Sequence, residues 1–280
     1  MTRKIPYMLI CLTGLLATGQ AAAEGPWVYE AGASTIGAGY VHDSYDEIWM
    51  GKNKTSFNKI TQQTLWLYYD RGLSSQLMMS VQTGYTKIKN ANPSSSEDSG
   101  LADSTVSLKY QWLNEFADNS PVSISSRMGL ILKGSYDRSS ANNPQASGDK
   151  ANGVEVAAQL GKFISNNVAL FGDLGYRFLD QQVPDEIFYS IGGNAEVTDR
   201  LSVSLQYAAK ASQTGLDIGG KGFSGEKDLY KVKEERNWLE FGVSVAVGNR
   251  SNISAGIANV LDGRNTGDSS IWNLNYTYTL

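Results

Sequence analysis

The sequence predicts an all-β protein, an antiparallel transmembrane β-barrel of about twelve strands. Three observations lead to this prediction. The chain of 280 residues begins with an export signal, it contains repeated runs in which apolar and polar residues alternate, and the connections between these runs alternate between short and long. Each run is about ten residues long, which is the length that a tilted strand needs to cross a bilayer.

The export signal occupies residues 1–23. Arg3 and Lys4 form a basic start, an apolar stretch follows over 5–17, and three alanines occupy 21–23. This is the order of a secretory signal peptide, so we expect cleavage after Ala23 and a single barrel domain over 24–280. Cys11 lies within the signal, where the bulky Ile10 before it argues against a lipoprotein anchor.

Composition and charge exclude several classes of function. The chain has 24 Lys and Arg against 28 Asp and Glu, and these charges are spread evenly along it. An even, slightly acidic distribution argues against a nucleic-acid partner. One His and one Cys exclude metal sites rich in these residues, so we expect no metal and no cofactor.

The strands are predicted from a period of two. Near the C-terminus, Trp272, Leu274 and Tyr276 share one face of a strand while Asn273 and Asn275 share the other. Comparable runs lie at roughly 27–41, 57–70, 76–87, 103–113, 121–135, 152–164, 168–180, 186–197, 201–212, 237–248, 252–261 and 270–280. In the first run the outward phase slips between Ala33 and Ile36, which predicts a bulge there.

The connections predict which way the barrel faces. Short connections lie at 71–75, 114–120, 165–167, 198–200 and 249–251. Longer or polar ones lie at 42–56, 88–102, 136–151, 181–185, 213–236 and 262–269. Short periplasmic turns opposite long external loops are typical of the bacterial outer membrane. A soluble β-sandwich is the alternative, but it does not explain the signal peptide and the loop pattern together.

The expected location implies partners. Aromatic residues near strand ends, such as Trp27, Trp112 and Tyr278, suggest interfacial girdles against outer-membrane lipid and lipopolysaccharide. The alternating C-terminus resembles the signal read by the barrel assembly machinery, although Leu280 stands where Phe is usual. The charged stretch 221–236 is expected to be a solvated loop. This loop would either fold over the mouth of the barrel or bind lipopolysaccharide phosphates through its lysines.

The polar faces of the strands are expected to line the lumen. The predicted lumen-lining charges are Glu30, Asp70, Lys109, Arg127, Lys133, Glu155, Asp173, Arg177, Lys210 and Glu240. Five acids balance five bases, so no ring of one sign predicts ion selectivity. Two interpretations stay open: the charges pair and hold the barrel shut, or they line a small polar conduit. Trp66, Tyr68, Ile131 and Phe188 are also expected to face inward, which suits a solute with an apolar part.

A family resemblance rests on the element Ser99-Gly100-Leu101-Ala102-Asp103, on 171–176 and on 192–203. In these segments the chain resembles the meta-pathway phenol-degradation family of outer-membrane proteins, distantly related to the long-chain fatty acid transporters. Two departures are Ala102, where that family has a second glycine, and Leu-Lys-Gly at 132–134, where it has Pro-Thr-Gly. The resemblance implies a channel for passive uptake of small solutes, with hydrophobic or aromatic compounds favoured.

Two other functions remain as alternatives. His42 and Ser44 are two residues apart and share a strand face, as the base and nucleophile of an outer-membrane lipid-modifying hydrolase do. Asp43 or Asp46 would then have to orient His42, and the surrounding residues are not those of such enzymes. A structural or adhesive surface barrel, whose loops do the work, is the other alternative.

Overall fold

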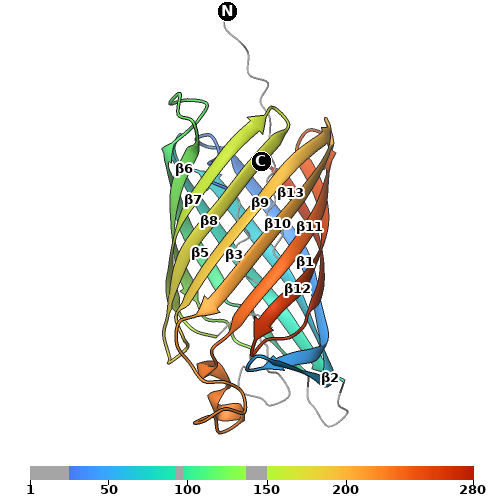
Figure 1. The fold of residues 1–280 in the computed structure, drawn as a ribbon. Helices are drawn as coiled ribbons and strands as arrows, with labels where there is room; N and C mark the ends of the chain where they lie inside the picture. The colour runs from blue at the N-terminus through green and yellow to red at the C-terminus, as the bar shows by residue number, and fades with distance from the viewer. Residues whose placement is uncertain (1–24, 92–96, 137–149) are drawn as a thin grey trace, which may run out of the picture.

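The structure is a computed structural model that describes residues 25–91, 97–136 and 150–280 (Figure 1). The predicted signal peptide lies outside the described residues. The strands are β1 (Ser34–Met50), β2 (Asn53–Gly72), β3 (Leu77–Asn90), β4 (Asp98–Leu101), β5 (Ser104–Leu113), β6 (Ser123–Leu132), β7 (Gly153–Ser165), β8 (Val168–Leu179), β9 (Glu186–Thr198), β10 (Leu201–Ser212), β11 (Glu235–Val247), β12 (Ser251–Arg264) and β13 (Ser270–Thr279).

The strands close into one antiparallel barrel. The sheet runs from β2 through β1 and β13 down to β5 and β3, and an additional pairing of β2 with β3 joins the two ends. The short β4 and the longer β5 both pair with β3, so they count as one interrupted strand of the barrel. The barrel wall therefore consists of twelve strands. The predicted fold class and strand number are therefore confirmed.

The outer wall is apolar and the inner wall polar, as a membrane barrel requires. The outside carries leucines that are more than half exposed, among them Leu65, Leu130, Leu174 and Leu274. Polar side chains at alternate positions are buried inside. Closure pairs the backbone groups that lipid cannot hydrogen-bond. The chain is a closed β-barrel with the wall of a transmembrane barrel. Among the described residues, no helix is long and apolar enough to cross a membrane.

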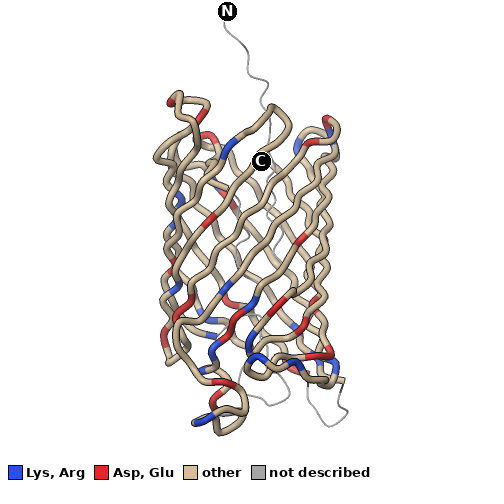
Figure 2. The backbone as a smooth tube through the Cα atoms, viewed as in Figure 1, with Lys and Arg blue, Asp and Glu red and all other residues tan. Residues whose placement is uncertain are grey.

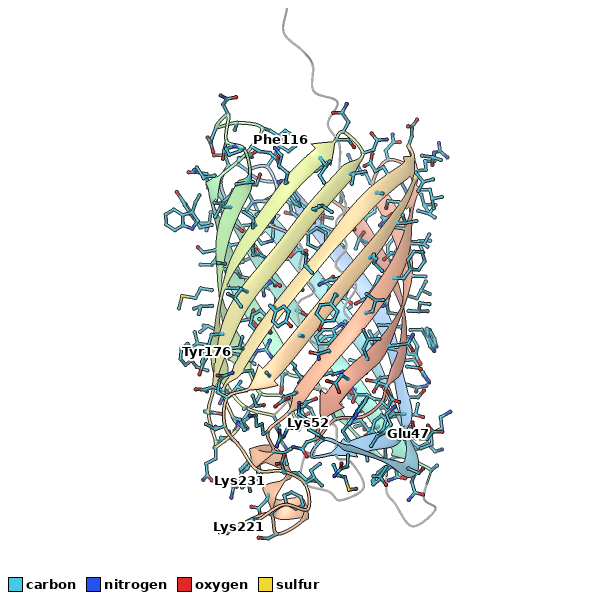
Figure 3. The ribbon with its side chains drawn as sticks, viewed as in Figure 1. Glu47, Lys52, Phe116, Tyr176, Lys221 and Lys231 are labelled. Atoms are coloured by element: carbon cyan, nitrogen blue, oxygen red, sulfur yellow. The ribbon has the colours of Figure 1, made fainter. Side chains whose placement is uncertain are left out.

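The two ends of the barrel differ. The C-terminus and the short turns share one end, and Phe116 in the β5–β6 turn marks it (Figures 1 and 3). The longer loops, including the short 3-10 helix η1 (Glu226–Lys231), lie at the opposite end, where Lys52, Lys221 and Lys231 are labelled. Charged residues gather toward that long-loop end (Figure 2). We therefore assign it to the cell exterior.

The first strand differs from the prediction in position. The expected run at 27–41 is wrong at both ends, because β1 begins at Ser34 and continues to Met50. The expected loop 42–56 is instead a long hairpin, in which Trp49 pairs with Lys54 beyond a register shift between Tyr45 and Glu47. That shift is the irregularity of this strand, and the bulge expected between Ala33 and Ile36 is absent from the described pairing. Burial of Ile48 and Trp49 against external loops stabilises the extension.

Candidate functional site: the barrel interior

Residues 25–33 enter the barrel at its periplasmic end instead of forming a strand. Gly25 and Pro26 are buried, and the Lys109 ammonium on β5 donates a 2.9 Å hydrogen bond to the Gly25 carbonyl. Trp27 lies edge-on to Phe163 of β7, with ring centroids 5.0 Å apart. Trp27 is therefore not part of an interfacial girdle. The segment fills part of the lumen and narrows any path through it.

Two glycines make room for this segment. A Cβ on Gly161 of β7 would lie 2.6 Å from the Pro26 ring. A Cβ on Gly72, at the end of β2, would lie 2.1 Å from the Glu30 carbonyl oxygen. The Gly72 carbonyl also accepts a 2.8 Å hydrogen bond from the Gly32 amide. The segment therefore crosses from the β5–β7 wall to the end of β2, held mostly by packing.

Buried ion pairs run around one side of the interior. Glu155 of β7 lies 2.7 Å from Arg127 of β6 and 2.7 Å from Arg177 of β8. Beyond them, Glu186 of β9 lies 2.8 Å from Arg177.

The chain of charges ends at Lys210 of β10, 3.5 Å from Glu186 and 2.6 Å from Glu234, just before β11. We call these six residues the charge ladder: Arg127, Glu155, Arg177, Glu186, Lys210 and Glu234. Each sign alternates with the next, so neighbouring strands neutralise one another.

The charge ladder favours holding the wall together over selecting ions. Burying a charge is costly unless it is paired, and losing one member of a buried pair leaves its partner uncompensated. Burial would raise the pKa of Glu234, but Lys210 and then Arg236 outweigh it and keep that pKa below its usual range. The ladder thus presents paired charges to the lumen, without a surplus of one sign.

An apolar layer faces the ladder from the other side of the interior. Its buried members are Val41, Trp49, Trp66, Ala102, Ala208, Trp238, Ala258, Val260 and Ile271, with the half-buried Tyr68 packed against them. Trp66 is 1% exposed and lies over Gly84, where a Cβ would come within 2.6 Å of its ring. The interior is therefore amphipathic, and large apolar side chains fill it in this structure.

The motif that carries the family resemblance forms an interruption in the wall between β4 and β5. Asp103 accepts hydrogen bonds from the Gly134 amide at 2.6 Å and from the Tyr136 hydroxyl at 2.8 Å. A Cβ on Gly134 would lie 2.0 Å from the Leu101 carbonyl oxygen. The Leu-Lys-Gly element therefore departs from the family at its first two positions, but it keeps the glycine that this close approach requires.

Loops from three parts of the chain are tied together at the extracellular mouth. The Asn265 side-chain oxygen accepts from the Gly51 amide at 2.7 Å and from the Ile218 amide at 3.0 Å, and its amide nitrogen donates to the Lys233 carbonyl at 2.7 Å. Next to it, Arg264 forms a bidentate pair with Asp217 at 2.7 and 2.6 Å. Hydrogen bonds from Arg264 and then Asn265 lower the pKa of Asp217 to about 2.

The predicted lumen-lining residues fall into two groups. Lys109, Arg127, Glu155, Asp173, Arg177, Lys210 and Glu240 are buried on the inner wall, and Asp70 is half-buried on the same face of β2 as Trp66. Glu30 and Lys133 form the second group, which lies outside the strands of the barrel wall. Glu30 is exposed in the segment before β1, and Lys133 is exposed just beyond the end of β6. Both predictions assumed that a strand extends further than it does.

The interior also contains charges that sequence reasoning missed. Asp43, Glu186, Glu234 and Arg236 are at least four-fifths buried by side chain, and Asp43 lies 3.5 Å from Arg236. All four lie at the ends of predicted strands or in predicted loops. The external extension of β1 and the early start of β11 bring Asp43 and Arg236 into the wall.

The structure places His42, the base of the hydrolase alternative, beside an aromatic side chain. The His42 ring stacks on the outward-facing Trp272, with centroids 5.2 Å apart. Asp43, one acid expected to orient His42, lies on the inner face against Arg236. Among the residues that the structure describes, no group of three or more His, Cys, Asp or Glu is placed to hold a metal ion.

Known structures share this fold at low sequence identity. The chain is similar to the COG4313 outer membrane channel from Pseudomonas putida F1, with a TM-score of 0.73 and 16% identity over 91% of this chain and 98% of that chain. For the NanC porin the TM-score is 0.52 and the sequence identity is 9%, over 86% of this chain and 100% of the porin. For the translocator domain of autotransporter NalP from Neisseria meningitidis the TM-score is 0.50 and the sequence identity is 13%, over 89% of each chain.

Neither a scan against family models nor a search of curated proteins found a match. A channel, a porin and a translocator share this barrel, so the comparison shows the fold alone, and function has to be argued from the interior.

Proposed function

We propose that the protein is a bacterial outer-membrane channel for passive uptake of small solutes with a hydrophobic or aromatic part. The observation that carries the proposal is the amphipathic interior, in which an apolar layer around Trp66 faces a wall of paired charges. Such a lining suits a solute with both an apolar body and a polar group. The resemblance of 99–103 to the phenol-degradation family supports the same solute class.

The N-terminal segment is the element that closes the path in this proposal. Within the described residues the backbone joins it to the barrel through β1, and packing and hydrogen bonds hold the rest. We propose that residues 1–23 are removed on export and that the barrel assembly machinery inserts the chain. Outer-membrane lipid and lipopolysaccharide would then surround the apolar wall. The proposal gives His42 and Ser44 no catalytic role.

Uptake by cells tests the proposal directly. A Gram-negative host lacking its general porins would express the protein, and entry of radiolabelled 3-phenylpropan-1-ol would be timed. We expect faster entry than in cells with an empty vector. Equal rates, with the barrel shown to be in the outer membrane, would refute the proposal.

A deletion tests the closing element. Removing 25–31 should raise single-channel conductance in planar bilayers, because the lumen loses the segment that crosses it. Removing the equally long external stretch 219–225 is the matched control and should leave conductance near that of the full chain. Equal conductance for the full chain and the 25–31 deletion would show that the segment does not limit passage.

A further inference from the structure

Glu240 of β11 is a buried acid for which the described residues provide no cationic partner. Its residue is 3% exposed. Within the described part of the chain, its one hydrogen bond comes from the Asn273 amide, 3.4 Å from Oε1, and it forms no ion pair. That distance is long for a hydrogen bond, so the Asn273 amide compensates the buried carboxylate only weakly.

Two acids of the charge ladder are treated differently, and Asp173 of β8, which also lacks an ion pair within the described residues, accepts a shorter hydrogen bond of 2.8 Å from Ser190. Glu155 contacts two arginines and Glu186 contacts an arginine and a lysine, all within the charge ladder. An ionisable side chain at membrane depth is costly and usually indicates a functional site. Glu240 therefore stands out as an acid that the barrel buries with neither an ion pair nor a short hydrogen bond among the described residues.

A relay of hydrogen bonds ends on this carboxylate. The Tyr68 hydroxyl donates to Asn275 at 3.2 Å, Asn275 donates to Asn273 at 3.1 Å, and Asn273 donates to Glu240. Tyr68 on β2 reaches Asn275 on β13 across β1. It can do so because a Cβ on Gly39 would lie 2.1 Å from both the Tyr68 hydroxyl and the Asn275 oxygen. The relay holds the polar groups in place and directs donors toward Glu240.

Apolar residues border Glu240 on β11 and on the β12–β13 side, while its partner on β10 is the polar Gln206. Trp238 precedes it by two residues on the same face of β11, Ala258 is its partner on β12, and Ile271 is the partner of Ala258 on β13. All three belong to the apolar layer. A carboxylate at the edge of an aromatic and aliphatic layer has the chemistry to bind a cation that carries a hydrophobic body.

We propose that Glu240 is the counter-ion of a lumen subsite for hydrophobic organic amines in their ammonium form. In the closed structure the Asn273 amide occupies the position of the ammonium, and a charged donor would replace it with a shorter, stronger hydrogen bond. The solute's apolar part would displace or pack beside the side chains around Trp238. The inference rests on the proposed channel function and narrows its solute class.

Two probes of matched shape test the subsite, 3-phenylpropylamine and 3-phenylpropan-1-ol. At pH 7 the first carries an ammonium where the second carries a hydroxyl. Calorimetry on the refolded full chain in a non-ionic detergent should show about tenfold tighter binding of the amine. Glu240→Gln keeps the shape but removes the charge, so it should abolish this preference while alcohol binding persists. Glu196→Gln, which removes a half-buried acid near the periplasmic end of β9, is the control and should keep the preference.

A second variant keeps the proposal testable if Glu240→Gln does not fold. Asn273→Ala removes the competing amide, so amine affinity should rise rather than fall. No amine preference in the wild type, an unchanged preference in Glu240→Gln, or no rise in Asn273→Ala would each overturn the proposal. Uptake of the neutral alcohol by cells is independent of these results. Its loss refutes the channel function, whereas alcohol uptake without amine preference refutes the subsite alone.

Discussion

The extracellular and periplasmic halves of the barrel are closed by different kinds of interaction. Toward the exterior, ion pairs link neighbouring strands through the charge ladder, and hydrogen bonds from Asn265 join three loops. Toward the periplasm, a single chain segment packs into the lumen through Pro26 and Trp27 and receives one buried hydrogen bond from Lys109.

The difference shows which closure is easier to reverse. Each external loop is anchored to the barrel at both ends, so breaking one contact leaves the others in place. Within the described chain, residues 25–33 continue into the barrel wall only through β1, so their docking also depends on packing and on hydrogen bonds such as those of Gly25 and Gly32. We therefore expect substitutions in the extracellular half to affect stability and substitutions at the periplasmic end to affect conductance.

The largest effect is expected in the charge ladder. Glu155→Ala leaves Arg127 and Arg177 buried beside each other without their shared acid. Breaking a buried pair in this way costs about 3–5 kcal/mol of unfolding free energy. Urea unfolding in detergent micelles measures it, with Glu196→Ala as the control. A loss no greater than that of the control would mean that the ladder does not stabilise the wall.

The next effect tests the packing of the N-terminal segment. Gly161→Ala places a Cβ 2.6 Å from Pro26, and such overpacking costs about 1–3 kcal/mol. The cost falls on docking, because the segment can leave, so conductance should rise while urea stability stays nearly constant. Gly129→Ala is the matched control, since its new Cβ meets its nearest neighbour at 3.4 Å. A drop in barrel stability with unchanged conductance would contradict the comparison.

A smaller effect is expected from the Asn265 hydrogen bonds that join the external loops. Asn265→Ala removes side-chain hydrogen bonds to Gly51, Ile218 and Lys233, which together contribute about 1–2 kcal/mol. We expect faster tryptic cleavage at the exposed Lys221, with the barrel itself intact. Asn259→Ala, which removes one exposed hydrogen bond to Ser270, should cleave at the wild-type rate. Equal cleavage rates for both variants would mean that Asn265 does not hold the external loops together.

The smallest effect concerns pH. The pKa of Asp217 lies at about 2, below its ordinary value of 3.8, so its contribution is present above about pH 4 and is lost as pH falls toward 2. The Asp217–Arg264 pair is near the surface, so Asp217→Asn should cost less than about 1 kcal/mol. The difference in urea stability between the wild type and Asp217→Asn should therefore be steady from neutral pH down to about 4 and shrink below it. A change near neutral pH would implicate another group.

Much of the barrel was predictable because its signals are local. Alternation of apolar and polar residues, as in Trp272 to Tyr276, depends only on the strand period. Seven predicted interior charges, Glu240 among them, followed from the same period and are buried on the inner wall. Glu30 and Lys133 were wrong because the period does not reveal where a strand ends. Asp43 and Arg236 were missed for the same reason.

The sequence by itself determined the fold class, the strand number and which face of most strands points inward, since each depends on neighbours along the chain. Tertiary structure decided what those residues meet. Gly39 lets Tyr68 reach Asn275 across a strand, Gly161 admits Pro26, and strand order places Glu155 between two arginines while leaving Glu240 without one. These contacts depend on closure and on the stagger between strands, because they join residues that only the completed barrel brings together.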